Sequence, residues 1–409
     1  MQISHAECGD SVVFYVSSMR VDGLVSVYHY WMYKFRNVSL DEFNITSSAT
    51  PKTDLQARFS TTYSIVANVC SVVSIVLTVL LYKRVSLQTK IIGSLVVMII
   101  LLVITLVFVW TNTDAWQDTF FIISLVIAGL LSGSGLCFTV SVFQFSVKFP
   151  PVYLGSMLSG QSVCGIVVSL VQIFTLAVGT SSQITAFIFF SIGVAFILGV
   201  QILFSLVMAK DKYMRDCLAI DDMVEHEISV DKSRIVEIFK KIIPIILTML
   251  LTAGSTIIIH PGLSSLAESI GKGNGRWNDV FFVPVCTFLF FNLFDFFGRE
   301  SSLRWNWLGG THVVLVTSVL RLILVPMIMF CNIQPRHHLP VVFDEDYAYG
   351  IFMIVFAFSA GYLTNLCLRL LQSVVQGGEM KIAMFITMMV MIIGMITCSF
   401  LSGVMRSLL

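Results

Sequence analysis

Charged residues are scarce in this sequence. Only 12% of the residues are Asp, Glu, Lys or Arg, whereas soluble globular domains carry about 25%. Hydrophobic residues make up 56% of the chain, and the mean hydropathy is +0.89. The formal net charge is only +1, so no basic surface for nucleic acid is indicated. The composition excludes an ordinary soluble domain and predicts an all-α polytopic membrane protein.

The motifs of metal and catalytic sites are also missing. The sequence has no Cys-x-x-Cys and no zinc-like spacing of His and Cys, and no His/Glu cluster accompanies a carboxylate. Its nine cysteines are scattered, most of them inside apolar segments, and are interpreted as small buried hydrophobic residues. We therefore expect no metal, no cofactor and no enzymatic activity. A channel is disfavoured because no filter segment is recognisable.

Long apolar runs dominate what is present. Ten segments of about 20 residues or more can each cross a bilayer core as a helix. The predicted spans are 59–81, 90–110, 119–146, 152–178, 184–208, 242–263, 279–298, 310–331, 347–368 and 383–405. Receptors of the common class have seven spans, so this count disfavours a receptor.

Two polar segments divide the chain. Residues 1–58 contain no spanning helix and no signal peptide, and they carry two glycosylation sequons, at Asn37 and Asn44. Residues 209–241 are rich in charges of both signs and are interpreted as a solvated linker. The predicted domains are therefore an extracellular or lumenal segment 1–58, a half-bundle 59–208, the cytosolic linker and a second half-bundle 242–409.

Lysine and arginine predict the orientation of the spans. If residues 82–89 face the cytosol, the loops on that side hold fifteen Lys and Arg residues, and the opposite loops with the C-terminal tail hold four. Cytosolic loops carry the excess of positive charge, so the linker is predicted to be cytosolic. The sequons then lie on the opposite side of the membrane, where glycosylation occurs.

The segment from Arg276 to Arg304 is apolar but carries three conspicuous polar residues. Asn292, Asp295 and Arg299 are separated by three and four positions, which places them near one face of a helix. An ionisable residue at the bilayer centre costs about 2.5–3.5 kcal/mol on insertion scales, so such residues face a bundle interior or a watery cavity. This face is a candidate binding site, and the alternative is a structural ion pair between Asp295 and Arg299.

The string FFVPVCTFLFFNLFDFFGR in this segment strongly resembles the signature of the equilibrative nucleoside transporters. Arg-Leu-Ile-Leu-Val-Pro from Arg321 and Cys-Asn-Ile-Gln-Pro-Arg from Cys331 resemble further family strings. The resemblance implies a major-facilitator-like bundle of two halves, with eleven spans in the family and about ten here. It also implies that substrate is bound near the midplane and exposed alternately to the two sides.

The resemblance also assigns roles to single residues. Ser159-Gly160-Gln161 matches a family triplet whose glutamine contacts the nucleobase, and the alternative is a tight helix contact of small residues. Asp295 and Arg299 are then expected to bind the ribose or base, with Asn292 as a weaker candidate.

Three further residues are singled out in the second half of the chain. Pro261 matches a family proline that would loosen the end of its helix. His260 is a candidate pH sensor, and the alternative is a residue that is merely wetted at a helix end. Arg321 is expected to balance a carboxylate or to line the inner cavity.

The N-terminal region departs from the family pattern. The aromatic-basic sequence Tyr28–Asn37 is present, but the helix that precedes it in the family is not recognisable. We therefore expect a truncated or alternatively started chain that resembles the family from about Tyr28 onward. The same aromatic-basic sequence resembles the lysosomal, proton-stimulated branch.

Two functions remain open. The first is facilitative transport of nucleosides by an integral protein of the plasma membrane or the lysosomal or late endosomal membrane, with proton coupling as a variant. The second is a truncated, non-transporting protein that modulates a full-length transporter.

Overall fold

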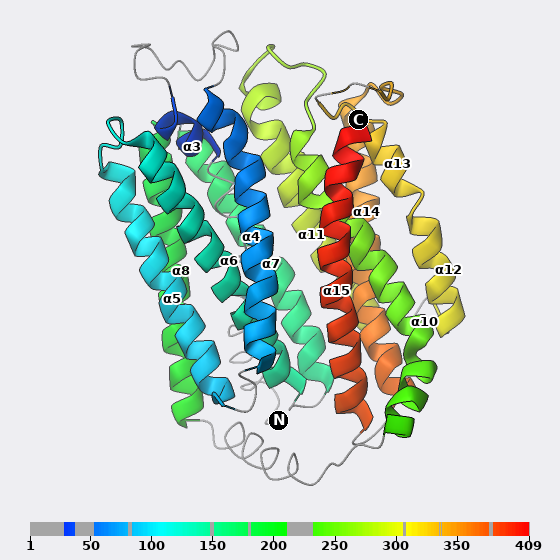
Figure 1. Cartoon of the computed structure of the whole chain (residues 1–409). Helices are drawn as coiled ribbons and strands as arrows, with labels where there is room; N and C mark the ends of the chain where they lie inside the picture. The colour runs from blue at the N-terminus through cyan, green and yellow to red at the C-terminus, as the bar shows by residue number, and fades with distance from the viewer. Residues whose placement is uncertain are drawn as a thin grey trace. The chain divides into compact units, whose positions relative to one another are not determined.

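The computed structural model of this chain describes residues 28–36, 53–80, 84–147, 151–178, 181–210, 232–305, 308–334, 336, 338–375 and 379–408. Regular structure within these residues is helical, apart from two isolated bridges that join Ala267 to Ile333 and Cys331 to Phe343. The predicted all-α class is therefore confirmed (Figure 1). The predicted glycosylation sites at Asn37 and Asn44 lie outside the described residues.

The described residues of each predicted span lie mainly in helices. Eight described stretches are long and apolar enough to cross a membrane: Leu87–Trp110, Gln117–Phe145, Ser159–Val178, Ser182–Lys210, Arg234–Leu266, Trp277–Arg304, Thr311–Met329 and Asp346–Val374. Two further helices, α4 (Asp54–Leu80) and α15 (Glu379–Leu408), contain shorter apolar stretches. A helix pairs its own backbone N–H and C=O groups in hydrogen bonds, and lipid offers these groups no other partners. The chain is thus a polytopic membrane protein.

The described residues form two compact units. Unit 1 comprises those within 146–173 and 211–409, and unit 2 comprises those within 16–145 and 174–210. Helix α7 (Pro151–Val178) was assigned from the sequence to the first half-bundle. In the structure, its residues up to Ile173 belong to the same unit as the C-terminal helices.

Unit 2 contains four long helices and one short one. Its elements are α3 (Tyr28–Lys34), α4, α5 (Leu87–Trp110), α6 (Gln117–Val147) and α8 (Ser182–Lys210). Helix α3 lies near the ends of the long helices (Figure 1).

Side chains of the long helices and their connections hold α3 in place. The Gln56 amide donates to the Met32 carbonyl at 2.7 Å, and the Gln117 amide donates to the Lys34 carbonyl at 3.0 Å. Lys34 in turn donates to the Thr111 carbonyl at 2.7 Å.

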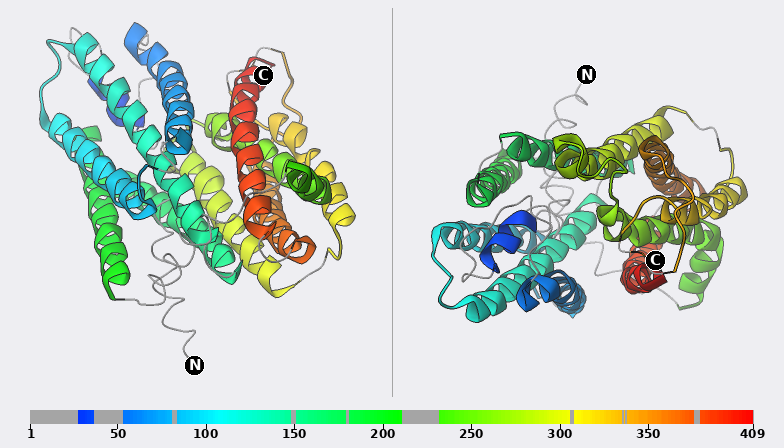
Figure 2. Two further views of the ribbon diagram at one scale, coloured as in Figure 1. Left: turned by 60° about the horizontal axis from the view of Figure 1, so that its bottom comes forward. Right: turned by 90° about the horizontal axis from the view of Figure 1, so that it is seen from above.

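Unit 1 is built around α14. The elements of this unit that follow α7 along the chain are α10 (Lys232–Ile257), η2 (Ile258–Leu263), η3 (Ser264–Leu266), η4 (Trp277–Phe281), η5 (Val283–Leu289), α11 (Phe290–Arg304), α12 (Thr311–Arg321), α13 (Leu324–Met329), α14 itself (Asp346–Val374) and α15. Helix α14 packs against α10, α11 and α12, and α15 packs against α10. These helices lie together in both views of Figure 2.

Helix α10 begins before the start predicted for the second half-bundle. Helix α10 begins at Lys232, so the last ten residues of the predicted linker are helical. Ile238 and Ile242 are buried at a spacing of four, while Lys240 and Lys241 are exposed. This amphipathic pattern continues the helix beyond the apolar span.

Prolines interrupt two of the predicted spans. A proline removes a backbone donor and its ring clashes with the carbonyl four residues earlier. Pro326 accordingly follows a break at Leu322 between α12 and α13. Pro284 lies in η5, whose wide turns precede the regular α11.

Candidate functional site

The Asp295 carboxylate is the centre of the candidate site. Asp295 lies in the middle of α11 and is only 6% exposed. The Arg299 Nε atom, one turn further along, donates to Asp295 Oδ2 at 2.8 Å. The spacing of four residues predicted from the sequence thus forms an ion pair inside an apolar span.

A serine from α7 binds the same carboxylate oxygen. Ser162 is 3% exposed, and its hydroxyl donates to Asp295 Oδ2 at 2.6 Å. Sequence reasoning selected the neighbouring Gln161 and missed Ser162. A usable signal was present, because Ser162, Gly165 and Ser169 recur at helical spacing and form one small-residue face.

That face of α7 packs closely on α11. The Asn292 amide donates to the Ser169 hydroxyl at 3.2 Å and to the Phe288 carbonyl at 2.9 Å. A methyl group at Gly165 would collide with the Asn292 side chain, so only glycine permits this approach. The two helices therefore meet through Asn292 and Asp295, two of the three polar residues predicted from the α11 sequence.

Two buried donors at the site are unpaired within the described part of the chain. These are Arg299 Nη1 and the Ser159 hydroxyl. Ser159 lies three residues before Ser162 and hence near the same face of α7. A buried donor without a partner costs about 1–3 kcal/mol, so such groups are candidates to bind a ligand.

The structure does not bring Gln161 onto the ion pair. Gln161 is half-buried, the preceding Gly160 is buried, and no hydrogen bond joins Gln161 to Asp295 or Arg299 in the described residues. The contact of Gln161 with a nucleobase therefore stays a prediction.

The end of α10 is irregular, as Pro261 predicted. Helical geometry is interrupted at His260, whose backbone is extended with φ −112° and ψ 129°. The His260 ring stacks on the Phe291 ring with centroids 4.0 Å apart, and its Nδ1 atom lies 3.2 Å from the Ser264 hydroxyl. His260 is therefore a packed residue next to α11 rather than a merely wetted one.

Arg321 is held by hydrogen bonds inside unit 1, and its two expected roles, balancing a carboxylate or lining the inner cavity, stay predictions. It is 4% exposed, and among the described residues no carboxylate forms an ion pair with it. Its guanidinium donates instead to hydroxyl and carbonyl oxygens of α10 and α14, from Thr252, Ser255, Thr256, Phe356 and Ser359. Arg321 thus joins three helices of unit 1.

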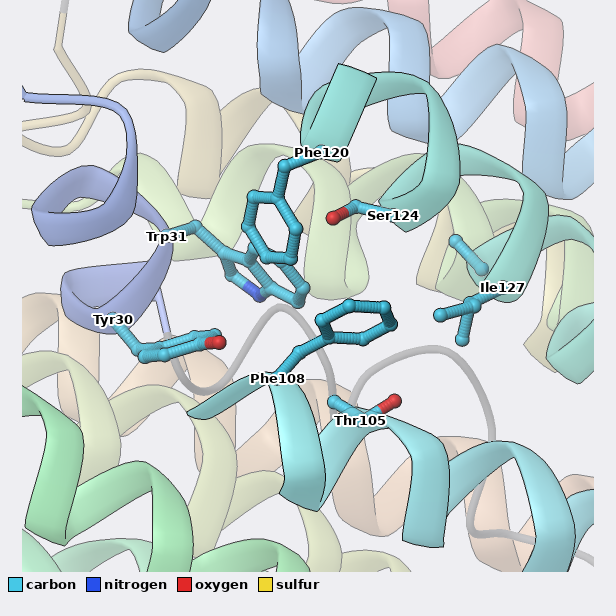
Figure 3. Close-up of a pocket in the computed structure, with 8 residues that line it drawn as sticks. Tyr30, Trp31, Thr105, Phe108, Phe120, Ser124 and Ile127 are labelled. Carbon is cyan, nitrogen blue, oxygen red and sulfur yellow. The ribbon is translucent and has the colours of Figure 1, made fainter. Parts of the chain in front are cut away.

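A separate small pocket lies within unit 2. Figure 3 shows its wall of aromatic rings, including Trp31, Phe108 and Phe120. The hydroxyls of Tyr30 and Ser124, both buried, have no hydrogen-bond partner among the described residues. None of the predicted site residues lines this pocket.

The described residues contain no group of three or more His, Cys, Asp or Glu side chains that could hold a metal ion. The chemistry available at α11 is therefore hydrogen bonding and charge pairing by Asp295, Arg299, Asn292 and the serines of α7. Such a set suits a polar, uncharged ligand with several hydroxyl or amide groups.

Comparison with known proteins adds an independent finding. The family model described as "Nucleoside transporter" matches residues 122–220 and 217–407. Equilibrative nucleoside transporter 1 of Homo sapiens is 29% identical over 373 residues, covering 81% of each chain. Its Rattus norvegicus counterpart is 27% identical, with 88% of this chain and 86% of the relative covered. Equilibrative nucleoside transporter 3 of Rattus norvegicus is also 27% identical, covering 84% and 76%.

Proposed function

Because this chain belongs to the nucleoside transporter family, we propose that it carries nucleosides across its membrane and binds them at the face of α11. The buried contact of Arg299 and Ser162 with Asp295 carries this proposal. Charged side chains are costly in a membrane span, and those that face a bundle interior commonly mark substrate pathways. The relatives compared above are transporters rather than enzymes.

Each side chain supplies one part of nucleoside recognition. The Asp295 carboxylate accepts hydrogen bonds from ribose hydroxyls or from a base amine, and the unpaired Arg299 Nη1 donates to a sugar oxygen. The Gln161 amide, which both donates and accepts, binds the base and tolerates several bases. Asn292 contributes a second amide one turn before Asp295.

Transport follows from alternating exposure of this site. Two half-bundles that rock about a bound substrate move it without a pore, and the gradient of nucleoside drives the flux. We place the protein in the plasma membrane or in the lysosomal or late endosomal membrane. Proton coupling is a variant of this proposal in which Asp295 or His260 takes up the proton.

Uptake of labelled adenosine and uridine tests the proposal. Cells without their own nucleoside uptake would express the chain or its Asp295→Asn variant, and surface delivery of both would be confirmed. Asp118→Asn, an exposed carboxylate at the start of α6, is the matched control. We expect saturable uptake that Asp295→Asn abolishes and the control preserves. A surface-delivered chain without any uptake favours the non-transporting alternative.

The same cells test proton coupling. Uptake at about pH 5.5 and about pH 7.4 brackets the ordinary pKa of histidine. Faster uptake at the lower pH, lost in His260→Gln, supports coupling through His260. Equal uptake at both values contradicts it and leaves simple facilitation.

A further inference from the structure

Ser162 is bound to the very oxygen that the proposed function offers to substrate. Asp295 Oδ2 accepts one hydrogen bond from the Ser162 hydroxyl at 2.6 Å and one from Arg299 Nε at 2.8 Å. Arg299 lies on the same helix as Asp295, one turn away. Ser162 is separated from Asp295 by 133 positions, and it belongs to another helix.

The surroundings of Asp295 determine which of its contacts can be released. On one side, α11 is pressed against α14, because a methyl group at Gly361 would collide with the Asp295 carbonyl oxygen. A methyl group at Gly298 would likewise collide with the Phe358 carbonyl oxygen of α14. The α11 backbone is therefore fixed to α14, whereas Ser162 reaches the carboxylate with a single hydroxyl. Release of the Ser162 hydrogen bond therefore requires no movement of α11 away from α14.

We infer that Ser162 determines specificity by holding on Asp295 the position that a ribose hydroxyl of the substrate takes. This inference rests on the proposed function, because it needs Asp295 to accept a hydrogen bond from the sugar. The substrate hydroxyl and the serine hydroxyl are chemically alike, so their exchange keeps the same number of hydrogen bonds on the buried carboxylate. The Asp295 carboxylate therefore accepts a hydrogen bond from Ser162 before the substrate binds and from the substrate hydroxyl afterwards.

The exchange makes binding sensitive to the sugar hydroxyls. A nucleoside that carries the 2′- and 3′-hydroxyls replaces Ser162 on the carboxylate through one of them, whereas a 2′,3′-dideoxynucleoside lacks both and leaves Ser162 in place. Without the serine hydroxyl, the carboxylate lacks one donor before binding, so a ribose hydroxyl gains more when it arrives. A dideoxynucleoside gains nothing from the change. Removal of the serine hydroxyl therefore strengthens binding of the ribonucleoside alone.

Equilibrium binding to the purified full-length chain in lipid nanodiscs tests this inference. The probes are adenosine and 2′,3′-dideoxyadenosine, and the variants are Ser162→Ala, Ser162→Thr and Asp295→Asn. We expect Ser162→Ala to lower the Kd of adenosine about three- to tenfold, the range for one hydrogen bond in a membrane protein, with the Kd of the dideoxy probe unchanged. Ser162→Thr keeps a hydroxyl and should restore the values of the unaltered chain.

The controls separate failure of the inference from failure of the function. Ser205→Ala removes a hydroxyl that, among the described residues, bonds the Gln201 carbonyl of its own helix, and it should change neither Kd. Equal changes for both probes in Ser162→Ala, or weaker adenosine binding, overturn the inference. If Asp295→Asn loses adenosine while Ser162→Ala behaves like the unaltered chain, the function stands and the inference falls. If the unaltered chain binds neither probe, both are overturned.

Discussion

Arg299 and Arg321 both lie within membrane spans of unit 1, and their environments differ. Arg321 of α12 uses Nε, Nη1 and Nη2 to donate to oxygens of α10 and α14, and its guanidinium lies 3.9 Å from the centre of the Phe356 ring. Arg299 of α11 donates to Asp295 through Nε, while its buried Nη1 has no partner in the described residues. A guanidinium whose nitrogens all donate to neighbouring helices holds those helices together. A guanidinium with an unpaired nitrogen can still donate a hydrogen bond to a ligand.

Replacement of Arg321 should have the largest effect on folding. Arg321→Leu leaves several buried oxygens of α10 and α14 without their donor, and each unsatisfied buried group costs about 1–3 kcal/mol. We expect little folded protein at the surface, measured by surface labelling and by monodispersity in detergent. Normal surface levels of Arg321→Leu would show that Arg321 is not needed for folding and so contradict the proposed difference from Arg299.

Replacement of Arg299 should affect transport more than folding. Arg299→Gln keeps a neutral donor near Asp295, and Ser162 still donates to the carboxylate, so surface levels should fall less than in Arg321→Leu. Uptake of uridine should fall about ten- to a hundredfold, the cost of about 1.4–2.8 kcal/mol in substrate binding. Uptake kinetics normalised to surface protein measure this. A fall in surface level that equals the fall in uptake would make Arg299 structural.

A smaller effect is expected where α14 supports Asp295. Gly361→Ala places a methyl group against the Asp295 carbonyl oxygen and must push α11 from α14. Overpacking costs about 1–3 kcal/mol, and it displaces the carboxylate from Ser162, so transport should fall more than surface level.

Gly350→Ala on the same helix is the matched control for that change. The added methyl group there meets only the Phe290 ring, at 3.8 Å. Alanine also favours a helix more than glycine does, so we expect unchanged or slightly higher thermal stability. Equal losses in both variants would show that α14 merely tolerates no methyl group.

The contrast between the two arginines also shows which features of the structure can be predicted from the sequence. The spans and the polar face of α11 were predictable, because ionisable residues are rare in apolar runs and each one is conspicuous. The hydrogen-bond partners of these ionisable residues on other helices were not predictable. Serine and threonine in a helix usually bond their own backbone, as Ser169 does to the Gly165 carbonyl at 2.8 Å. The small-residue face of α7 marks Ser162 as a candidate for helix packing, but nothing in the sequence shows that Ser162 binds Asp295 or that Ser255 binds Arg321.

A third buried cation, Lys34 of unit 2, extends the comparison and gives the smallest predicted effect. Lys34 is 2% exposed and donates to the Thr111 carbonyl at 2.7 Å. Burial lowers its pKa from 10.5 to about 8, with Asp114 opposing the shift and Arg36 adding to it. Because the folded pKa lies below the unfolded value, the charged lysine destabilises the folded chain below pH 8, and stability rises between about pH 8 and pH 10.5.

The size of that rise is limited by relaxation of the side chain. The shift corresponds to at most about 3 kcal/mol, and a lysine near a helix end can move its ammonium group toward water, which reduces the effect below that value. Thermal unfolding of the unaltered chain and of Lys34→Met at pH values across this window measures it. Lys34→Met should lose the rise and be at least as stable at neutral pH, since an apolar side chain fills the same site without a buried charge. If the stability of Lys34→Met still rises with pH across this window, the rise comes from another titrating group and not from Lys34.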